Sequence, residues 1–353
     1  MQSRILHIAS ILIYEAAALS ACSLVDEDMR DCENDYELDY ELQLVTNLTT
    51  ELQTQLSLAA DVSVSSALET EMRDVFTDFA HDVDLSFYDV EGDSLRLHHE
   101  SHVMDAAESS YTLNIPVRKY MHLAVANVVN NPMVQLSEGE KCHEAAFYQV
   151  VQDTVESHTK GLFSARLLMD VKEGVDQQFD VGLYMVNCAS SIVLDTLGSG
   201  IKDLKVFMTG FASGFSIADS TYRFDHNPII RPVKVVVEDE PGAPLCFASV
   251  NFPSRDVKGT KLVIDTDEPF DSDTADHALW QIKVYCTLLD GSITETILDI
   301  FNSLRPGQFK VIRAKVRKDG AADPVTPSGE GDSTVGVSVT LDWSSGMVID
   351  VPL

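Results

Sequence analysis

The cysteine at position 22 has the surroundings that indicate the most definite chemistry in this sequence. It closes the run Leu19-Ser20-Ala21-Cys22, behind an apolar stretch that begins at Ile5 and one early positive charge, Arg4. A positive start, an apolar segment of about 7–15 residues and small residues before a cut are typical of a secretory signal. The order Leu, small, small, Cys is the pattern at which bacterial lipoprotein signals are cleaved and the thiol takes a diacylglyceryl group. We expect cleavage between Ala21 and Cys22 and lipidation of Cys22.

An ordinary secretory signal is the alternative, because His7 and Glu15 interrupt the apolar run. Lipidation is favoured, since Cys22 falls where the small residues end and an acidic chain begins. One acyl chain anchors weakly and two or more hold firmly, at about 0.8 kcal/mol for each buried CH₂. After residue 22 no run approaches the roughly 20 apolar residues of a membrane helix. The acylated cysteine is therefore the expected contact with membrane lipid.

Histidines are densest in the run His98-His99-Glu100-Ser101-His102. The zinc-binding helix of metalloproteases needs His-Glu-x-x-His, which brings both imidazoles to one helical face. Only one residue separates Glu100 from His102, so that geometry is broken. On a strand, His98, Glu100 and His102 would share a face and could hold a metal weakly. The favoured expectation is a solvated loop cluster without a metal.

No catalytic residue can be assigned. The acidic run from Asp265 to Asp276 lacks the glycine and glutamate positions of an EF-hand calcium loop. The segment Gly210-Phe211-Ala212-Ser213-Gly214 is one residue out of order for a nucleophile elbow, and the sequence has no phosphate-binding glycine pattern. The cysteines include no CxxC pair, which argues against structural zinc. We expect no enzyme, no metal ligands and no cofactor.

The charge of the chain excludes one class of partner. The sequence of 353 residues has a formal net charge of −31, whereas nucleic-acid binding calls for clustered Lys and Arg. Nine acidic residues and one basic residue, Arg30, lie between Cys22 and Glu41. Such a block is typical of a solvated tether beside a folded domain.

Hydrophobic periodicity predicts mostly strands. Alternation of apolar and polar residues from Tyr36 to Leu44 is typical of a half-buried strand. Apolar residues on one helical face predict a helix over 65–80. Asp290-Gly291 predicts a tight hairpin turn, and 145–155 fits helix or strand equally. Further strands are expected at 83–90, 111–117, 120–129, 162–171, 179–186, 191–194, 204–208, 233–237, 245–251, 261–264, 278–288, 293–300, 335–343 and 347–351.

The strand pattern starts again near residue 188, which suggests two domains. We expect a signal peptide over 1–21, an acidic tether over 22–35, and domains over 36–187 and 188–353. Many short strands at near-regular spacing predict a mainly β fold of two β-sandwiches, with one or two helices in the first. Cys246 and Cys286 lie among strand-like apolar residues and should be buried.

Four segments, in this order, resemble a known family. They are the lipobox with its acidic residues and Cys32, the aromatic strand Leu85–Gly92, the strand Tyr120–Asn127, and the C-terminal run Val335–Trp343. Together they resemble the fimbrial anchor lipoproteins of the FimB type, from type V pili, across nearly the whole mature chain. Lys119 stands where that family usually has glycine.

The resemblance implies two tandem transthyretin-like β-sandwiches, the fold class that the strand spacing also indicates. It implies a surface-exposed outer-membrane lipoprotein with acyl groups such as palmitate on Cys22. Such a protein anchors or caps a fimbrial shaft, limits its length and serves cell adhesion. The acidic residues after Cys22 also look like signals for surface export. The implied partners are outer-membrane lipid and fimbrial shaft subunits.

Type V pilins polymerise by strand exchange, in which an extended segment of one subunit completes the sheet of another. We expect a C-terminal segment of this chain to be donated to the first shaft subunit. The strand Tyr36–Leu44 should stay in its own sheet, because its removal would sever the lipid tether. An equally weighted alternative is that both terminal strands close their own sandwiches. The candidate donor residues are Val335, Val337, Val339, Leu341, Trp343, Val348 and Ile349.

A glycan-binding surface lipoprotein is the alternative function. Glycan sites usually need exposed aromatic platforms, and the sequence has two tryptophans, Trp280 and Trp343. Trp343 is in phase with an apolar strand face, which favours a core position over a platform.

Overall fold

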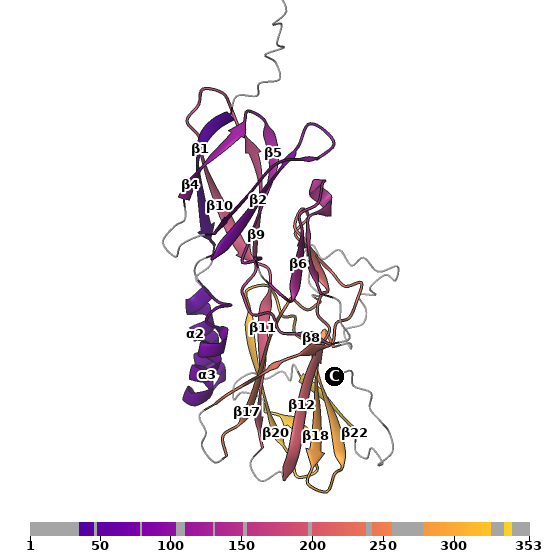
Figure 1. Ribbon diagram of the computed structural model, residues 1–353. Helices are drawn as coiled ribbons and strands as arrows, with labels where there is room; N and C mark the ends of the chain where they lie inside the picture. The colour runs from indigo at the N-terminus through magenta and orange to yellow at the C-terminus, as the bar shows by residue number, and fades with distance from the viewer. Residues whose placement is uncertain are drawn as a thin grey trace, which may run out of the picture.

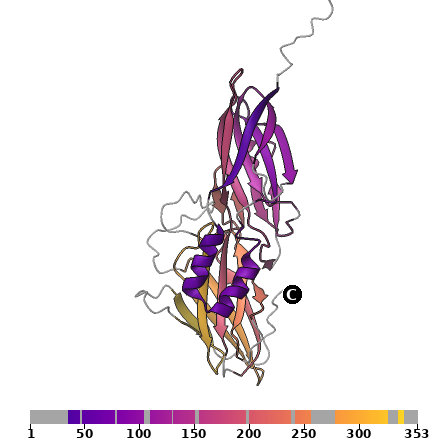
Figure 2. The same cartoon turned by 90° about the vertical axis from the view of Figure 1, so that its left-hand side faces the viewer.

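Two β-sandwiches stacked end to end make up most of the chain, with a small sheet beside their junction and two helices along the second sandwich (Figures 1 and 2). The predicted mainly β fold is therefore confirmed. The computed structural model describes residues 35–45, 48–77, 80–103, 110–129, 131–150, 154–196, 200–237, 242–255, 278–325 and 335–340. None of the helices in these ranges is long and apolar enough to cross a membrane.

The first sandwich has one layer of three strands and one of four. The three-stranded layer contains β4 (Ser110–Pro116), β1 (Asp35–Leu44) and β10 (Gln178–Met185). The four-stranded layer contains β3 (Arg96–Val103), β2 (Asp82–Asp89), β5 (Lys119–Ala126) and β9 (Phe163–Asp170). The layers join where β9 and β10 pair at one end. The predicted alternation in β1 is confirmed, since Leu38, Tyr40 and Leu42 are buried while Glu37 and Asp39 are exposed.

A small four-stranded sheet takes strands from both halves of the chain. Its order is β14 (Thr221–Arg223), β13 (Gly214–Ser216), β7 (Ala146–Gln149) and β6 (Val134–Ser137). A 3₁₀ turn, Cys142–Glu144, links β6 to β7. Phe147 and Phe215 of this sheet belong to one apolar cluster with Tyr88 and Leu123 of the first sandwich. The small sheet thus covers the outer face of the β2–β5 layer.

The second sandwich has layers of five and six strands. The five-stranded layer contains β16 (Val233–Val235), β17 (Leu245–Asn251), β11 (Cys188–Asp195), β20 (Phe309–Val316) and β21 (Ala322–Pro324). The six-stranded layer contains β22 (Val335–Thr340), β19 (Ile293–Ile300), β18 (Trp280–Leu288), β12 (Ile201–Thr209), β15 (Ile230–Arg231) and β8 (Val155–Glu156). The core between them includes Trp280, Ile282, Ile192 and Cys286.

The helices α2 (Leu48–Ala59) and α3 (Val62–Met72) cover the outer face of the five-stranded layer (Figure 2). Leu52, Leu56 and Leu68 belong to the same apolar cluster as Val193 and Ala248 on that face. One or two helices were predicted for the first sandwich, and the one with stated bounds was placed over 65–80. Their apolar faces instead pack on the second sandwich, because the outer face of its sheet is also apolar.

Several strands depart from the sequence-based prediction. The histidine run, expected in a loop, forms the edge strand β3. Within the ambiguous segment 145–155, Ala146–Gln149 form β7 and Val155 begins β8. The strands β6, β13, β14, β15, β20 and β21 were not predicted. The hairpin at Asp290-Gly291 is confirmed, with Gly291 at a φ of 89°. The predicted strands 261–264 and 347–351 lie outside the described residues.

The helix packing can be tested with two leucines of the helix pair. Leu68 is fully buried against the second sandwich, while Leu58 is 79% exposed. Because truncation of a buried leucine leaves a cavity, we expect Leu68→Ala to lower the free energy of unfolding by about 2–5 kcal/mol. Leu58→Ala should change it by less than about 0.5 kcal/mol. Urea unfolding followed by circular dichroism measures both, and equal effects would contradict the described packing.

Candidate functional site

The strand β1 is paired on both of its edges. It pairs antiparallel with β4 from Asp35 to Glu41 and parallel with β10 from Asp39 to Leu44. Its Tyr40 hydroxyl lies 2.5 Å from Nε2 of the buried His122 on β5, in the facing layer. Strand β1 is therefore fixed by both neighbours and by the core. The predicted cleavage and lipidation residues, Ala21 and Cys22, lie outside the described residues.

The strand β22, at the other end of the chain, has a different environment. It lies at the edge of the six-stranded layer and pairs with β19 from Val335 opposite Ile300 to Thr340 opposite Glu295. Val335, Val337 and Val339 lie opposite Ile300, Leu298 and Thr296, which are fully buried. Residues directly opposite each other in an antiparallel pair share one face of the sheet. The three valine positions are therefore in register with the core face.

The other candidate donor residues, Leu341, Trp343, Val348 and Ile349, lie outside the described residues. In this structure both terminal strands that are described, β1 and β22, pair within their own chain.

The histidines of β3 point to its two faces in alternation. On the face toward the sandwich core, Nε2 of His98 and Nε2 of His102 lie 2.6 and 2.9 Å from the two carboxylate oxygens of Glu100. Partial burial raises the pKa of Glu100, but the two histidine hydrogen bonds more than offset this and bring its pKa below the usual value. These three residues do share a face, as the strand alternative predicted.

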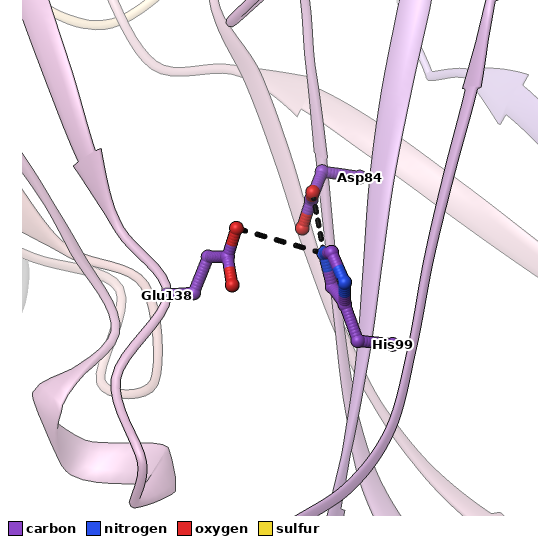
Figure 3. A group of neighbouring side chains, drawn as sticks. All are labelled: Asp84, His99 and Glu138. Carbon is purple, nitrogen blue, oxygen red and sulfur yellow. Dashed lines mark hydrogen bonds and ion pairs between the residues drawn. The ribbon is translucent and has the colours of Figure 1, made fainter.

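On the other face of β3, His99 meets two carboxylates (Figure 3). Its Nε2 lies 2.7 Å from Oδ2 of Asp84 on β2 and 3.7 Å from Oε1 of Glu138, which follows β6. Sequence reasoning missed this group, because its members are far apart in the chain. The only available signal was the alternation within 98–102, which separates His99 from His98 and His102 on a strand.

Two buried histidines lie away from these clusters. Burial lowers the pKa of His122 to about 4, although a hydrogen bond with the Ser86 carbonyl opposes this shift. Burial also lowers the pKa of His158 to about 3. Both ring nitrogens of His158 lack a hydrogen-bond partner among the described residues, and its ring packs edge-on against Phe252. Both histidines are therefore neutral near pH 7.

Three of the four described cysteines and the described tryptophan are core residues, while Cys142 is partly buried. Cys188, Cys246 and Cys286 are free thiols with no exposed surface, which confirms the expectation for Cys246 and Cys286. Burial raises the pKa of Cys246 to about 12 and that of Cys286 to about 11. Trp280 is 1% exposed, and its indole N–H donates to the Asn302 carbonyl at 3.0 Å. Trp280 therefore offers no exposed platform.

Comparison with known proteins gives matches of fold only. No family model matches the chain, and no curated protein matches it. A Bacteroides thetaiotaomicron structure named for polysaccharide binding is similar with a TM-score of 0.50 and 10% identity, over 83% of this chain and 99% of that chain. An adhesin-named Bacteroides ovatus structure gives a TM-score of 0.49 and 13% identity, over 89% and 96% of the two chains.

The fimbrial anchor protein Mfa2 from Porphyromonas gingivalis is also similar in structure. Its TM-score is 0.45 at 8% identity, over 87% of this chain and 98% of that chain. At these identities the likeness shows the two-sandwich fold alone.

The buried side chain of His158 gives a prediction about how the stability of the chain changes in acid. Between pH 6.5 and pH 3 the unfolded chain binds a proton at position 158 that the folded chain does not, so stability falls as pH falls through this range. His158→Leu should therefore lose less stability between pH 7 and pH 5 than the unaltered chain, by on the order of 1–2 kcal/mol. Urea unfolding at both pH values measures this difference.

The exposed Leu58 provides the control. Leu58→Ala should leave the difference in stability between the two pH values unchanged, since leucine carries no titratable group and this side chain is 79% exposed. If His158→Leu is as acid-sensitive as the unaltered chain, His158 does not stay neutral in the folded state.

Proposed function

We propose that this chain is a fimbria-associated outer-membrane lipoprotein that anchors a type V fimbria to the cell surface. The observation that carries the proposal is the unequal pairing of its terminal strands. Strand β1, which follows the lipobox cysteine, is paired on both edges, while β22 has one partner strand among the described residues. One end of the chain is thus suited to permanent attachment and the other to exchange.

The membrane attachment would come from acyl groups on Cys22, with the acidic segment 22–35 as tether. Several acyl chains on one cysteine hold a protein firmly, because each buried CH₂ contributes about 0.8 kcal/mol. The first strand after this tether, β1, cannot leave its sheet without breaking two hydrogen-bonded ladders and uncovering Leu38, Tyr40 and Leu42. A lipid on Cys22 would therefore hold the whole first sandwich.

The shaft attachment would use the C-terminal segment. If β22 leaves β19, it uncovers a row of backbone N–H and C=O groups on β19. Exposed strand edges pair readily with other chains, and main-chain hydrogen bonds with alternate side chains in pockets give such pairing affinity and specificity. The departing segment would complete the sheet of a shaft subunit in the same way. In this proposal the domain over 36–187 provides the membrane attachment and the domain over 188–353 provides the shaft attachment. This role requires no catalysis.

The lipid attachment is tested by Cys22→Ala. We expect fimbriae in the culture medium instead of on the cells, because the proposed anchor loses its acyl groups. Immunoblots of fimbrial protein in cell and medium fractions measure the distribution. Cys32→Ala is the matched control and should keep fimbriae on the cells. Retention of fimbriae by cells carrying Cys22→Ala would argue against anchoring through this residue.

Exchange of β22 is tested by a disulfide lock. Ser338 of β22 and Ile297 of β19 are opposite each other. Cysteines at both positions should join the strands under oxidising conditions, so we expect fewer attached fimbriae and recovery after addition of dithiothreitol. The control lock pairs Ile297→Cys with Lys283→Cys on β18, also directly opposite, and should leave attachment unchanged.

The two outcomes separate the possible donor segments. If the lock between β22 and β19 leaves attachment unaltered, β22 is not the exchanged strand. Deletion of Met347–Leu353 then tests the final segment, and normal attachment in that variant as well would leave neither terminal segment as the donor.

Glycan binding is the second candidate function, favoured by the fold shared with the Bacteroides thetaiotaomicron protein named for polysaccharide binding. A hollow of about 270 Å³ beside the second sandwich, lined in part by Phe211, Phe224 and Arg255, is where a small glycan could fit. The burial of Trp280 makes this alternative weaker, since aromatic platforms need an exposed face. Binding of the purified chain to a polysaccharide panel would favour it.

A further inference from the structure

We propose that Asp84, His99 and Glu138 form a binding site for a divalent transition-metal ion of the Zn²⁺ class. Each residue offers one ligand atom, and the three atoms lie within 4.8 Å of one another. They come from β2, from β3 and from the segment after β6, and their side chains point toward one another (Figure 3). This site is independent of the proposed attachment to a fimbria.

The distances from the His99 imidazole to the two carboxylates suit tetrahedral coordination. Zinc binds imidazole nitrogen and carboxylate oxygen at about 2.0–2.2 Å, so two ligand atoms of a tetrahedral site lie about 3.3 Å apart. The two separations from His99 Nε2, 2.7 Å to Asp84 and 3.7 Å to Glu138, lie on either side of that value. Side-chain adjustments of about half an ångström would bring both to it. Three protein ligands leave one position for water.

The ligand types favour a transition metal over calcium or magnesium. Ca²⁺ and Mg²⁺ take oxygen ligands, whereas an imidazole nitrogen suits Zn²⁺, Cu²⁺ and Ni²⁺. Arg96 contacts the second oxygen of Glu138, Oε2, and leaves Oε1 directed at His99. Two carboxylates and one guanidinium give the group one excess negative charge, which favours a cation.

The ligands are held in place by neighbours that do not bind the ion. The Ser101 hydroxyl donates to Oδ2 of Asp84 at 2.8 Å, and the Tyr88 hydroxyl donates to the Glu138 carbonyl. Such outer partners fix the orientation of metal ligands and affect affinity. The Asp84 side chain is 10% exposed, while those of His99 and Glu138 are 32% and 36% exposed. The ligands are thus oriented by hydrogen bonds from neighbouring residues, and the site is accessible to solvent.

A bound ion would fasten two parts of the fold together. Asp84 and His99 belong to the first sandwich, while Glu138 belongs to the connection between β6 and β7 of the small sheet. Backbone hydrogen bonds from Arg96 to Glu140 and from Cys142 to Ser94 already join these parts. Metal ligation would add a further link, so binding should raise the thermal stability of the chain.

The test is calorimetric titration of the purified chain with ZnCl₂ after treatment with EDTA. We expect a binding event with one ion per chain and a rise in Tm on addition of zinc. His99→Gln and Glu138→Gln should each weaken this event by about tenfold or more, since each removes a direct ligand. His102→Gln, which alters the opposite face of the same strand, should bind zinc as the unaltered chain does. Circular dichroism and Tm in EDTA check that each variant is folded.

Substitution of Co²⁺ gives a second readout. The visible d–d absorption of tetrahedral Co²⁺ should appear with the unaltered chain and with His102→Gln, and should be lost with His99→Gln. Unchanged zinc affinity in folded His99→Gln, or loss of binding in His102→Gln alone, would overturn the proposal. Absence of zinc binding by the unaltered chain would overturn it as well.

Discussion

The burial of one sheet on both of its faces determines how this molecule is assembled. The five-stranded layer of the second sandwich packs on its partner layer with Ile192 and Ile312. Its opposite face, with Val193 and Cys246, packs on the helices from the first half of the chain. A sheet with two apolar faces needs a cover on each side. The second sandwich therefore depends on residues 48–77, which precede β11, the first strand of this five-stranded layer, by more than a hundred positions in the sequence.

The same constraint accounts for the small residues of β11 and β17. Ser190, Ser191 and Ser249 have no exposed surface. Small side chains let the covering layers approach closely, but a buried hydroxyl without a hydrogen bond costs stability. Ser249 donates to the Asn251 side chain at 2.9 Å, whereas the Ser191 hydroxyl has no partner among the described residues. The close packing of the sheet is therefore accompanied by the loss of stability from the Ser191 hydroxyl.

The sequence predicted the elements whose pattern is local and could not predict contacts between distant segments. The alternation in β1 and the Asp290-Gly291 turn are signals within a few residues, and both match the structure. The edge strand β3 was missed because its core-facing positions hold His98, Glu100 and His102 instead of apolar residues. The amphipathic pattern of the helices predicted a buried face but not the sheet that it would meet.

The candidate sites also differ in whether they depend on a local sequence pattern or on contacts between distant segments. The terminal segments are proposed from short motifs, whereas the meeting of Asp84, His99 and Glu138 depends on the pairing of β2 with β3 and on the position of the small sheet. No spacing rule within one segment contains that information.

The orientation of β1 has a mechanical consequence. It begins at the pole of the first sandwich farthest from the second and runs toward the helices (Figure 1). Hydrogen bonds of an antiparallel ladder lie perpendicular to the strands, so tension along β1 stretches the whole ladder in shear instead of opening it bond by bond. Strand β22 has a single ladder among the described residues, whereas β1 has two. Under an axial pull between its two ends, the chain should therefore yield at β22 while β1 stays in its sheet.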